Sequence, residues 1–450
     1  MNLTYYPSHK HILNQYERFC GQHTGIMESQ IVMQANSSLI RNVTLATAVM
    51  PNYHKALFGD SAEISYHLSG YGIYKEEAYV RLLGEGIERY GLFTSVLYYK
   101  DKLEYHTYNE LAEKYPDKVI PWTLIDIYGD KEYEKLERST FLSRVTKDDI
   151  IGWVECPSLF DKNRSYYIPA QMMFIGYRIN KEKNEKWFTP AFSKGSAAHT
   201  SLEKALAGAI TESIESDALM LKWYGQYHAK EVIIDDYDLS MIVNKILDGT
   251  NYSMRVYDYT IDPELGYVFG VALINNYNER PKVVMGCSSN YDPRKAIYRG
   301  LMEAMAILYL VINGPIVMPK DYLECAHEKE YANLDSNVSF WASITNSEEK
   351  LAHLENIVDG RKALSSYPDL LAEEGVNELD KLLTELKKIS KYSVFMDITP
   401  VEVDKKGLKV MRVFSPDLVQ MSFPGMPYSK HPRMIKYGGV QQNEFPHPLP

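Results

Sequence analysis

A strand–turn–helix unit occurs three times along the chain, and each of its three helices carries glutamate where a core would carry leucine. The helical segments are Glu85-Gly86-Ile87-Glu88-Arg89, Glu212-Ser213-Ile214-Glu215-Ser216 and Arg299-Gly300-Leu301-Met302-Glu303. Two of them contain Glu-x-x-Glu, a spacing that places both carboxylates on one face of a helix. Like charges at this spacing repel unless a cation lies between them. Two such pairs and a fifth glutamate form a plausible cage for a hard divalent metal, most simply Mg²⁺ carrying phosphates.

Apolar alternation, small-residue turns and helix caps give approximate bounds for the three units. We expect the strands at 64–68, at 187–188 with 191–192, and at 282–285. We expect the turns that follow them at 69–72, 193–198 and 286–289. We expect the helices from Glu76 to about Leu97, from a cap at Thr200 or Ser201 to about Tyr224, and from Asp292-Pro293 onward, with proline at the favoured first position.

The second helix has two distinct faces. One is an ordinary core stripe, formed by Leu206, Ile210, Ile214 and Leu221. The opposite face carries Glu212 and Glu215 among small residues, namely Ser201, Ala205, Gly208, Ala209 and Ser216. A solvated face would normally carry Lys, Arg and Gln there. The small residues indicate that another backbone or a ligand approaches the two carboxylates closely.

The rest of the chain indicates one intertwined α/β (α+β) domain. Further strands are expected at 231–234, 255–257, 267–274, 394–398 and 410–414, and an amphipathic helix at 377–389. Residues 346–375 are polar and indicate loops, and residues 1–60 lack strong periodicity, as in a segment that packs on a core. No low-complexity linker divides the chain. From residue 423 onward the sequence is rich in proline and glycine and should be irregular.

Composition excludes several classes of protein. The net charge of −10 argues against nonspecific nucleic-acid binding. The four cysteines, Cys20, Cys156, Cys287 and Cys325, lie far apart, which argues against a cysteine zinc site and a disulfide framework. The N-terminus has no apolar signal region, and the longest apolar run, 304–312, is too short to span a bilayer. A cytoplasmic location follows.

Each candidate residue also has a plainer interpretation. Surface exposure is the commonest fate of glutamate, and from spacing alone this alternative to a metal site stays open. Arg89 can pair with Glu85 at the i,i+4 spacing or face phosphate. The glycine-containing turns are not Walker loops, and without other evidence they are simple tight turns. Among the twelve histidines, His199 is the one to watch, because it follows the second small-residue loop.

The chain ends in Pro446-His447-Pro448-Leu449-Pro450. One interpretation is a disordered polyproline II tail. However, proline fixes φ and lowers the entropy that is lost on ordering. A tail that places its terminal carboxylate inside a site would have this sequence.

Taken together, these segments resemble the YcaO superfamily over about 60–450. The resemblance rests on Gly84 to Tyr90, on Ser193 to Ala198 leading into Glu212 to Ala218, and on Asp292-Pro293 leading into Arg299 to Glu303. The Pro-x-Pro-x-Pro ending resembles the azoline-forming members. The whole chain, including segments 33–38 and 423–433, resembles the D proteins of streptolysin S-type toxin clusters. The implied domains are an N-terminal segment, 1–60, and a YcaO domain, 61–450, whose tail, 423–450, enters the active site.

The resemblance implies an ATP-dependent peptide cyclodehydratase. It implies that the metal ligands for Mg²⁺ are Glu85, Glu88, Glu212, Glu215 and Glu303. It implies that the ATP contacts are Ser69, Gly70, Arg81, Arg89, Ser193, Gly195, Ser196 and Arg299. Catalysis would depend on Glu85, Glu215 and the terminal carboxylate of Pro450. The implied partners are a precursor peptide with a leader, a leader-binding C protein and a flavin-dependent B dehydrogenase, with a homodimer in the complex.

Several positions depart from the family's pattern. A first turn that usually reads Gly-Lys-Gly has Tyr71 in place of lysine. Arg81 stands where serine is usual, Ser216 where arginine is usual, and a glutamine usual after the third glutamate is replaced near Ala306. Arg81 could supply the cation that the missing lysine no longer gives. Two alternatives remain: another YcaO reaction, such as thioamidation or macroamidine formation, or a catalytically weak scaffold of the synthetase complex.

Overall fold

The computed structural model describes residues 14, 18–21, 25–34, 36–59, 67–225, 228–317, 330–332, 334–372, 376–441 and 445–450. The strands are β1 (Glu28–Gln34), β2 (Thr44–Val49), β3 (His67–Gly72), β4 (Glu104–His106), β5 (Ile151–Pro157), β6 (Ser165–Pro169), β7 (Ser196–His199), β8 (Ala229–Ile233), β9 (Tyr252–Asp258), β10 (Tyr267–Asn275), β11 (Val283–Asn290), β12 (Val358–Ala363), β13 (Val394–Asp397) and β14 (Lys409–Phe414). The helices are α2 (Tyr53–Phe58), α3 (Lys75–Tyr99), α4 (Tyr108–Lys114), α5 (Asp130–Ser139), α6 (Ala170–Met173), α7 (Leu202–Tyr224), α8 (Tyr237–Leu247), α9 (Pro293–Val317), α11 (Leu334–Ala342), α12 (Ser347–Asn356), α13 (Glu378–Ile389), α14 (Val401–Asp404) and α15 (Pro432–Lys436).

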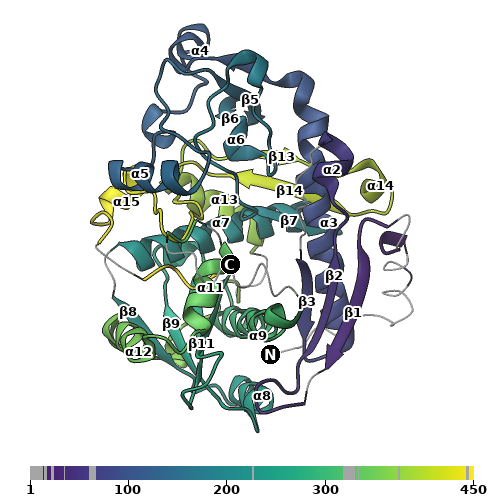
Figure 1. Ribbon diagram of the computed structural model, residues 1–450, viewed down its shortest axis with the longest axis vertical. Coiled ribbons are helices and arrows are strands. Elements are labelled where there is room, and N and C mark those ends of the chain that lie inside the picture. Colours follow the sequence, from purple (N-terminus) through teal and green to yellow (C-terminus); the bar gives the residue numbers. More distant parts are fainter. Residues whose placement is uncertain are drawn as a thin grey trace.

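The described strands form four sheets, which Figure 1 shows around the long helices α3, α7 and α9. Three sheets have three strands, in the orders β1-β2-β3, β13-β14-β7 and β4-β5-β6, and all of their pairs are antiparallel. The fourth has the order β11-β10-β9-β8-β12, and only its β12–β8 pair is parallel. The predicted mixed α/β class is confirmed.

The three predicted units are present, and each takes its strand from a different sheet. Strand β3 precedes α3, β7 precedes α7, and β11 precedes α9. The helix bounds agree closely with those expected from sequence: Ser201 caps α7 through a hydrogen bond from the Lys204 amide (3.4 Å), and Pro293 is the first residue of α9. The three glutamate-bearing helices therefore start from the ends of three separate sheets and converge between them.

The small-residue segments were predicted to be turns, and for the most part this is wrong. Gly70 and Gly286 lie within strands β3 and β11, and β7 begins at Ser196. The glycines are there because each helix presses on its strand. A Cβ at Gly70 would lie 1.9 Å from the Ala78 carbonyl oxygen of α3, and one at Gly286 would lie 2.2 Å from that of Gly300 in α9. Close helix–strand packing, not chain reversal, selects these residues.

Two other expectations are also wrong. Residues 187–192 are irregular and belong to no strand. Their backbone makes isolated hydrogen bonds instead of a ladder: the Trp187 carbonyl accepts from the Ser143 amide, and the amide of the fully buried Phe188 donates to the Gln171 side chain. Residues 346–375 are not mainly loops, since they include α12 and β12. Strand β12 is a polar, exposed edge strand, so it shows no alternation of apolar residues. Of the first predicted strand, 64–68, the part at 64–66 lies outside the described residues.

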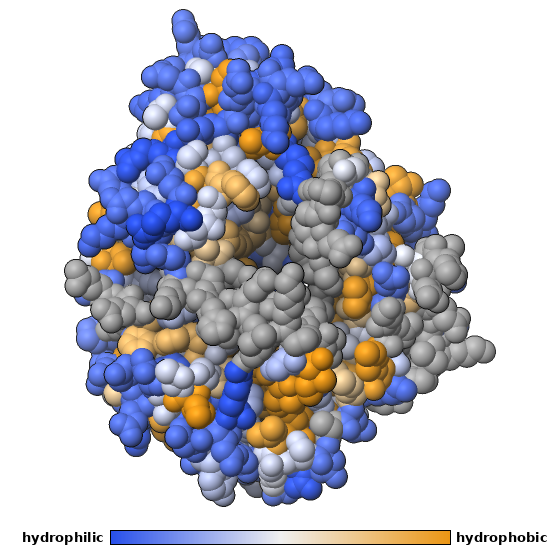
Figure 2. Space-filling model, viewed as in Figure 1, coloured by the Kyte–Doolittle hydropathy of each residue, from blue (hydrophilic) through white to orange (hydrophobic). Residues whose placement is uncertain are grey.

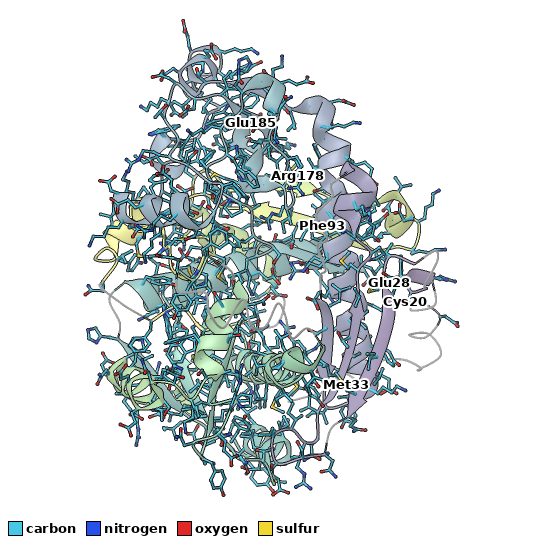
Figure 3. The ribbon with its side chains drawn as sticks, viewed as in Figure 1. Cys20, Glu28, Met33, Phe93, Arg178 and Glu185 are labelled. Atoms are coloured by element: carbon cyan, nitrogen blue, oxygen red, sulfur yellow. The ribbon has the colours of Figure 1, made fainter. Side chains whose placement is uncertain are left out.

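Segment 1–60 contributes structure of its own. Strands β1 and β2 extend the sheet of β3, so this segment completes the support behind the first unit. The upper lobe in Figure 1 is formed by α4, α5 and β4–β6, and it presents mostly hydrophilic residues in Figure 2. Within this lobe Glu185, labelled in Figure 3, is a buried carboxylate that accepts hydrogen bonds from the Gly152 and Asn180 amides (2.9 and 2.7 Å) and from the Tyr177 hydroxyl.

Helix α9 has the length and apolar composition of a membrane span over Pro293–Ile316, but 67% of its most apolar window is buried inside the molecule. It contacts strands β10 and β11 over its length and carries Glu303 near its middle. It is therefore a core helix of the fold. Among the described cysteines, Cys20, Cys156 and Cys287 form no disulfide, while Cys325 lies outside the described residues.

Candidate functional site

Within each unit the strand or loop donates a backbone amide to the glutamate of the helix that follows it. The Ser69 amide donates to Glu85 (2.8 Å), the Gly195 amide to Glu212 (3.3 Å), and the Cys287 amide to Glu303 (2.7 Å). The same arrangement thus recurs three times in three sheets. Because a backbone amide is held by the strand itself, these bonds fix the helix carboxylates relative to the strand ends.

Two further bonds connect one unit to another. The Ser196 hydroxyl of the second unit donates to Glu88 of the first (2.6 Å), and the Ser289 amide of the third donates to Glu215 of the second (3.2 Å). The chain of contacts therefore runs from α3 through α7 to α9. It brings all five predicted glutamates to one place in the structure.

The carboxylates are close enough to repel one another. Burial, followed by repulsion from Glu88 and Glu215, raises the pKa of Glu212 to about 8. Burial and repulsion from Glu215 and Glu212 raise the pKa of Glu303 to about 7. Burial also raises the pKa values of Glu85 and Glu88, with added repulsion from Glu212 on the first and from Glu85 on the second. The site therefore carries more negative charge than its own cations neutralise.

Arg89 lies beside the first pair of glutamates. Its guanidinium nitrogens are 3.8 Å from carboxylate oxygens of Glu85 and Glu88. The i,i+4 pairing with Glu85 that the spacing predicted is therefore present. At this distance the contact is a loose ion pair rather than a hydrogen bond.

Arg81 and Arg299 lie on the side of the site where Tyr71 stands. Arg81 donates to Glu77 (2.8 Å), and its guanidinium lies 5.1 Å from the centre of the Tyr71 ring. Part of the Arg299 side chain reaches the surface, while desolvation of its guanidinium and the neighbouring Arg81 lower its pKa. Arg81 and Arg299 therefore lie close enough to interact electrostatically.

The remaining predicted nucleotide contacts lie on the strands and loops between the helices. Ser69 and Gly70 are in β3, and Ser196 is the first residue of β7. Gly195 has a φ of +89°, and Ser193 precedes it in the same loop. His199, at the far end of β7, is within 3.3 Å of the Thr200 hydroxyl and makes no described contact with the glutamates.

Sequence reasoning missed two cations of the site. Lys194 donates to Glu215 at 2.6 Å, and the buried Arg412 of β14 donates to the carbonyls of Phe192, Ser193 and Lys194 at 2.8, 3.0 and 2.7 Å. Burial lowers the pKa of Arg412 to about 10, against the attraction of Glu212 and Glu88. The only sequence signal was the position of Lys194 beside Gly195; nothing in the strand at 410–414 indicated the role of Arg412.

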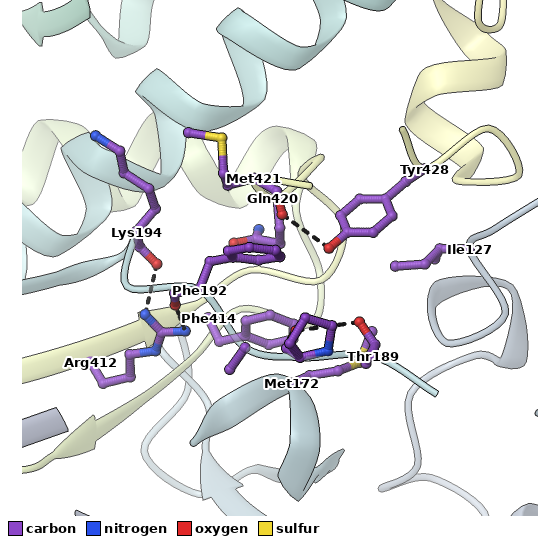
Figure 4. A pocket seen from close by; sticks show the side chains of 12 residues that line it. Ile127, Met172, Thr189, Phe192, Lys194, Arg412, Phe414, Gln420, Met421 and Tyr428 are labelled. Atoms are coloured by element: carbon purple, nitrogen blue, oxygen red, sulfur yellow. Dashed lines mark hydrogen bonds between the residues drawn. The ribbon is translucent and has the colours of Figure 1, made fainter. Parts of the chain in front are cut away.

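A small cavity lies on the other side of the loop that Arg412 holds. Its lining is largely apolar and includes Phe192, Phe414 and Met421. Figure 4 shows the Lys194 ammonium directed away from this lining, while Arg412 reaches the loop carbonyls. The loop at 192–195 thus separates an apolar interior from the charged glutamate site.

The donor set fits a hard divalent cation. All five candidate ligands are carboxylates, the donor type that Mg²⁺ prefers. Burial, with repulsion from neighbouring carboxylates, raises the pKa values of Glu212 and Glu303. Across the described part of the chain, no three Asp, Glu, His or Cys side chains form a ready metal cage. Lys194 and the backbone amides bind carboxylate oxygens instead. Metal binding would therefore require these side chains to turn toward one another.

The C-terminal tail is ordered over Phe445–Pro450. Side chains bind the tail carbonyls one after another: Trp223 donates to Phe445 (3.0 Å) and Trp341 to Pro446 (2.8 Å). The Asn337 amide group donates to the carbonyls of both His447 (2.5 Å) and Leu449 (2.6 Å). The alternative of a disordered polyproline II end does not hold for these residues.

The surroundings of the tail connect it to the glutamate helix. Trp223 and Tyr224 are the last residues of α7, and the Tyr224 hydroxyl accepts from the His447 amide (3.2 Å). Arg433 of α15 binds the Asp217 carboxylate at 2.8 and 2.9 Å, two residues after Glu215. Figure 1 shows the C-terminal end over the middle of the molecule, beside α11. Of the tail, only Pro450 is exposed at its very end.

Comparison with known proteins agrees with this geometry. The model of the family described as YcaO cyclodehydratase, ATP- and Mg²⁺-binding, matches residues 69–419. A search of curated proteins finds no match. Among solved structures, a heterocyclase in complex with substrate and cofactor has a TM-score of 0.71 at 19% identity and covers 98% of this chain. The present chain covers only 57% of that heterocyclase, so it spans little more than half of its length.

Two other solved structures match over nearly their whole length. YcaO from Methanopyrus kandleri bound with AMPPCP and Mg²⁺ has a TM-score of 0.59 at 15% identity, with 97% of this chain and 93% of that chain covered. A chain of the E. coli microcin synthetase McbBCD complex has a TM-score of 0.63 at 15% identity, with 96% and 98% covered. At these identities the likeness shows a shared fold.

Proposed function

The chain belongs to the YcaO cyclodehydratase family, which binds ATP and Mg²⁺, and we propose that it is the cyclodehydratase subunit of a synthetase that makes thiazolines and oxazolines. Its substrate would be a ribosomal precursor peptide of a streptolysin S-type cytolysin or bacteriocin. The observation that carries the proposal is the convergence of five glutamates from three strand–helix units, next to a helix end that holds the tail. A scaffold would have no need to retain that charge.

The reaction can be written with all atoms balanced. The thiol of Cys, or the hydroxyl of Ser or Thr, attacks the preceding amide carbonyl carbon and forms the ring. The γ-phosphoryl group of ATP is transferred to the former carbonyl oxygen, which leaves as phosphate. The amide nitrogen loses its proton as the C=N bond forms, and the proton of the attacking thiol or hydroxyl passes to a base, giving an azoline, ADP and phosphate. Phosphorylation is needed because an amide oxygen is a poor leaving group. The protein's task is to position the reactants and to stabilise the charge on the phosphates.

We propose the following roles for the residues of the site. Glu85, Glu88, Glu212, Glu215 and Glu303 would hold Mg²⁺, which neutralises phosphate charge when bound. Ser69, Gly70, Ser193, Gly195 and Ser196 would offer backbone amides and hydroxyls to the nucleotide, and Arg81, Arg89 and Arg299 would offer cations. Glu85 and Glu215 would also orient the reacting groups.

The tail would act on the peptide. Pro446, Pro448 and Pro450 limit the motion of the last residues, and the carbonyl bonds from Asn337 and Trp341 hold them in place. The terminal carboxylate of Pro450 would then accept the proton of the attacking thiol or hydroxyl, or orient the amide. General-base catalysis of this kind is worth about 10²–10⁴ in rate.

Partners follow from the relatives. The chain matches almost all of a microcin synthetase chain but little more than half of the heterocyclase. We therefore propose that leader binding comes from a separate C protein and oxidation of azolines to azoles from a flavin-dependent B protein. Within the complex the chain would form a homodimer in the cytoplasm. On its own it should turn over the precursor slowly.

An isotope experiment tests the proposed chemistry. The chain is combined with its C protein, ATP, Mg²⁺ and a Cys/Ser/Thr-rich precursor that carries heavy oxygen at its amide carbonyls. We expect the peptide to lose one water per ring and the heavy oxygen to appear in inorganic phosphate. Ring formation without heavy oxygen in the inorganic phosphate would contradict the mechanism. Equal ring formation by the Glu212→Gln/Glu215→Gln variant would show instead that the chain is a scaffold.

A further inference from the structure

Lys194 is the cation in closest contact with the glutamate cluster among the described residues. Its ammonium lies 2.6 Å from the Glu215 carboxylate, a charge-assisted hydrogen bond. The Glu215 side chain is 9% exposed, but that of Lys194 is 20% exposed. The carboxylate is thus almost enclosed, whereas the ammonium can still be reached by a ligand that enters the site.

The charge of Lys194 acts on more than its direct partner. Burial alone would lower the pKa of Lys194, but attraction to Glu215, Glu303 and Glu212 raises it well above its usual value. In turn Lys194 partly offsets the raised pKa values of Glu212 and Glu303. One ammonium therefore interacts with carboxylates from both α7 and α9.

The other cations of the site are held elsewhere. Arg81 binds Glu77 at 2.8 Å, and Arg412 binds three loop carbonyls. Arg89 approaches Glu85 and Glu88 only to 3.8 Å. Arg81, which the sequence indicated as the replacement for the missing lysine, is thus committed to Glu77. Lys194 is the ammonium available for that task.

The backbone of Lys194 is fixed while its side chain is flexible. Arg412 holds the carbonyls of 192–194 from strand β14, and Gly195 follows with a φ that other residues rarely adopt. A lysine side chain has a flexible four-carbon stem, and its ammonium can donate hydrogen bonds in many directions. From an anchored backbone the ammonium can therefore leave Glu215 for another anion nearby without rearrangement of the loop.

The charge of Lys194 also acts on the first unit. Burial and the charge of Glu303 raise the pKa of Tyr71, and the charges of Arg81 and Lys194 oppose this shift. The Lys194 charge therefore extends to Tyr71 of strand β3.

We propose that Lys194 is a tethered counter-ion of the site, which balances Glu215 when no metal is bound, yields it to the metal, and then binds nucleotide phosphate. This inference rests on the proposed function. It agrees with the finding that no three carboxylates among the described residues already form a metal cage. The metal and Lys194 compete for Glu215, but they cooperate once phosphate is present.

Calorimetry of the full chain separates these two effects. Mg²⁺ alone, and AMPPCP with saturating Mg²⁺, are titrated into the wild type and into Lys194→Met. The titrations are run at about pH 9, where Glu212 and Glu303 are ionised. We expect Lys194→Met to bind Mg²⁺ alone about tenfold more tightly and AMPPCP about tenfold more weakly, each equivalent to about 1.4 kcal/mol. Lys194→Arg, which keeps the charge, should recover part of the AMPPCP affinity.

The control is Lys204→Met, since Lys204 is an exposed lysine near the start of α7 and should change neither affinity. Unchanged or weaker Mg²⁺ binding by folded Lys194→Met would overturn the competition. Unchanged AMPPCP binding would overturn the phosphate role, while the proposed function would stand. A wild type that binds neither Mg²⁺ nor AMPPCP would defeat the proposed function and this inference together.

Discussion

The glutamate site and the tail receptor, which consists of Trp223, Tyr224, Asn337 and Trp341, are built in opposite ways although helix α7 contributes to both. Glu212 and Glu215 lie near the middle of α7, and Trp223 and Tyr224 lie at its C-terminal end. In the site, burial and the repulsion between like charges raise the pKa values of carboxyl groups, to about 8 for Glu212 and about 7 for Glu303. The receptor has neutral donors that bind four tail carbonyls. The carboxylates of the site thus remain able to bind a ligand, whereas the donors of the receptor hold the tail in one conformation.

Glu185 supports this contrast. It is a buried carboxylate like those of the site, but amides and a hydroxyl satisfy it from several sides. The glutamates of the site accept fewer such bonds and lie among other carboxylates. A structural carboxylate accepts all of its hydrogen bonds from the protein, whereas a ligand-binding carboxylate keeps oxygen lone pairs for its ligand.

The largest effect should come from removing charge from the site. Glu212→Gln/Glu215→Gln keeps the shape of α7 but removes two candidate metal ligands, so azoline formation should fall by at least about 10⁴-fold. Rates are measured by mass spectrometry of the precursor in the full complex. Glu348→Gln/Glu355→Gln on α12 is the matched pair of exposed glutamates and should leave the rate unchanged. An equal fall in the azoline-forming rate of both double variants would contradict a special role for Glu212 and Glu215.

A change at the tail should separate catalysis from binding. One or two residues added after Pro450 move the terminal carboxylate by about 3.3 Å each. Azoline formation should fall about 10²–10⁴-fold. AMPPCP binding and complex assembly should persist, because the glutamate site is untouched. A wild-type rate from the extended chain would mean that the carboxylate has no part in the reaction.

A weaker version of the same test acts on the receptor. Asn337→Ala leaves the carbonyls of His447 and Leu449 without their donor, at a cost of about 1–3 kcal/mol. The tail should then detach in a fraction of molecules, which lowers azoline formation about tenfold and increases cleavage of the tail by carboxypeptidase. Asn244→Ala, at an exposed asparagine of α8, is the control. If tail cleavage rises without loss of rate, the tail's order is not needed for catalysis.

The smallest effect is on stability. The folded-state pKa values of Glu212 and Glu303 lie above the usual value of 4.5, so the metal-free folded protein binds more protons than the unfolded one between about pH 4.5 and 8. Stability should therefore fall as pH rises through this window. Glu212→Gln should reduce the fall by about 1–3 kcal/mol in urea unfolding, and Mg²⁺ should restore wild-type stability at pH 8. A variant with the same pH dependence as the wild type would contradict the repulsion.

The same contrast decides what the sequence could predict. Glutamate spacing and helix-start signals are local patterns, so the five glutamates, their helices, the cap at Ser201 and the helix start at Pro293 could be found from the sequence. The receptor could not be found, because Trp223, Asn337 and Trp341 are far apart in sequence and meet only in the fold. The proline pattern of the tail indicated order but not its partners.

One error and one omission have the same cause. Small residues at Gly70 and Gly286 indicated turns, whereas they allow helices to press on strands, a contact that depends on the third dimension. Lys194 was not predicted as a cation of the site, because it reaches Glu215 from another segment of the chain. Local spacing predicts which side chains share a face. It does not predict which of the nearby cations a buried carboxylate will bind.

The central claim is that the glutamate site and the tail serve one reacting amide from two sides. The most direct test is a crystal structure of the full chain with AMPPCP and Mg²⁺, in which the distance from the Pro450 carboxylate to the terminal phosphorus is measured. The account predicts metal ions bound by the glutamates and roughly 6–8 Å between those two groups, enough for one amide between them. A terminal carboxylate directed at solvent, or separated from the phosphate by more than about 15 Å, would contradict it.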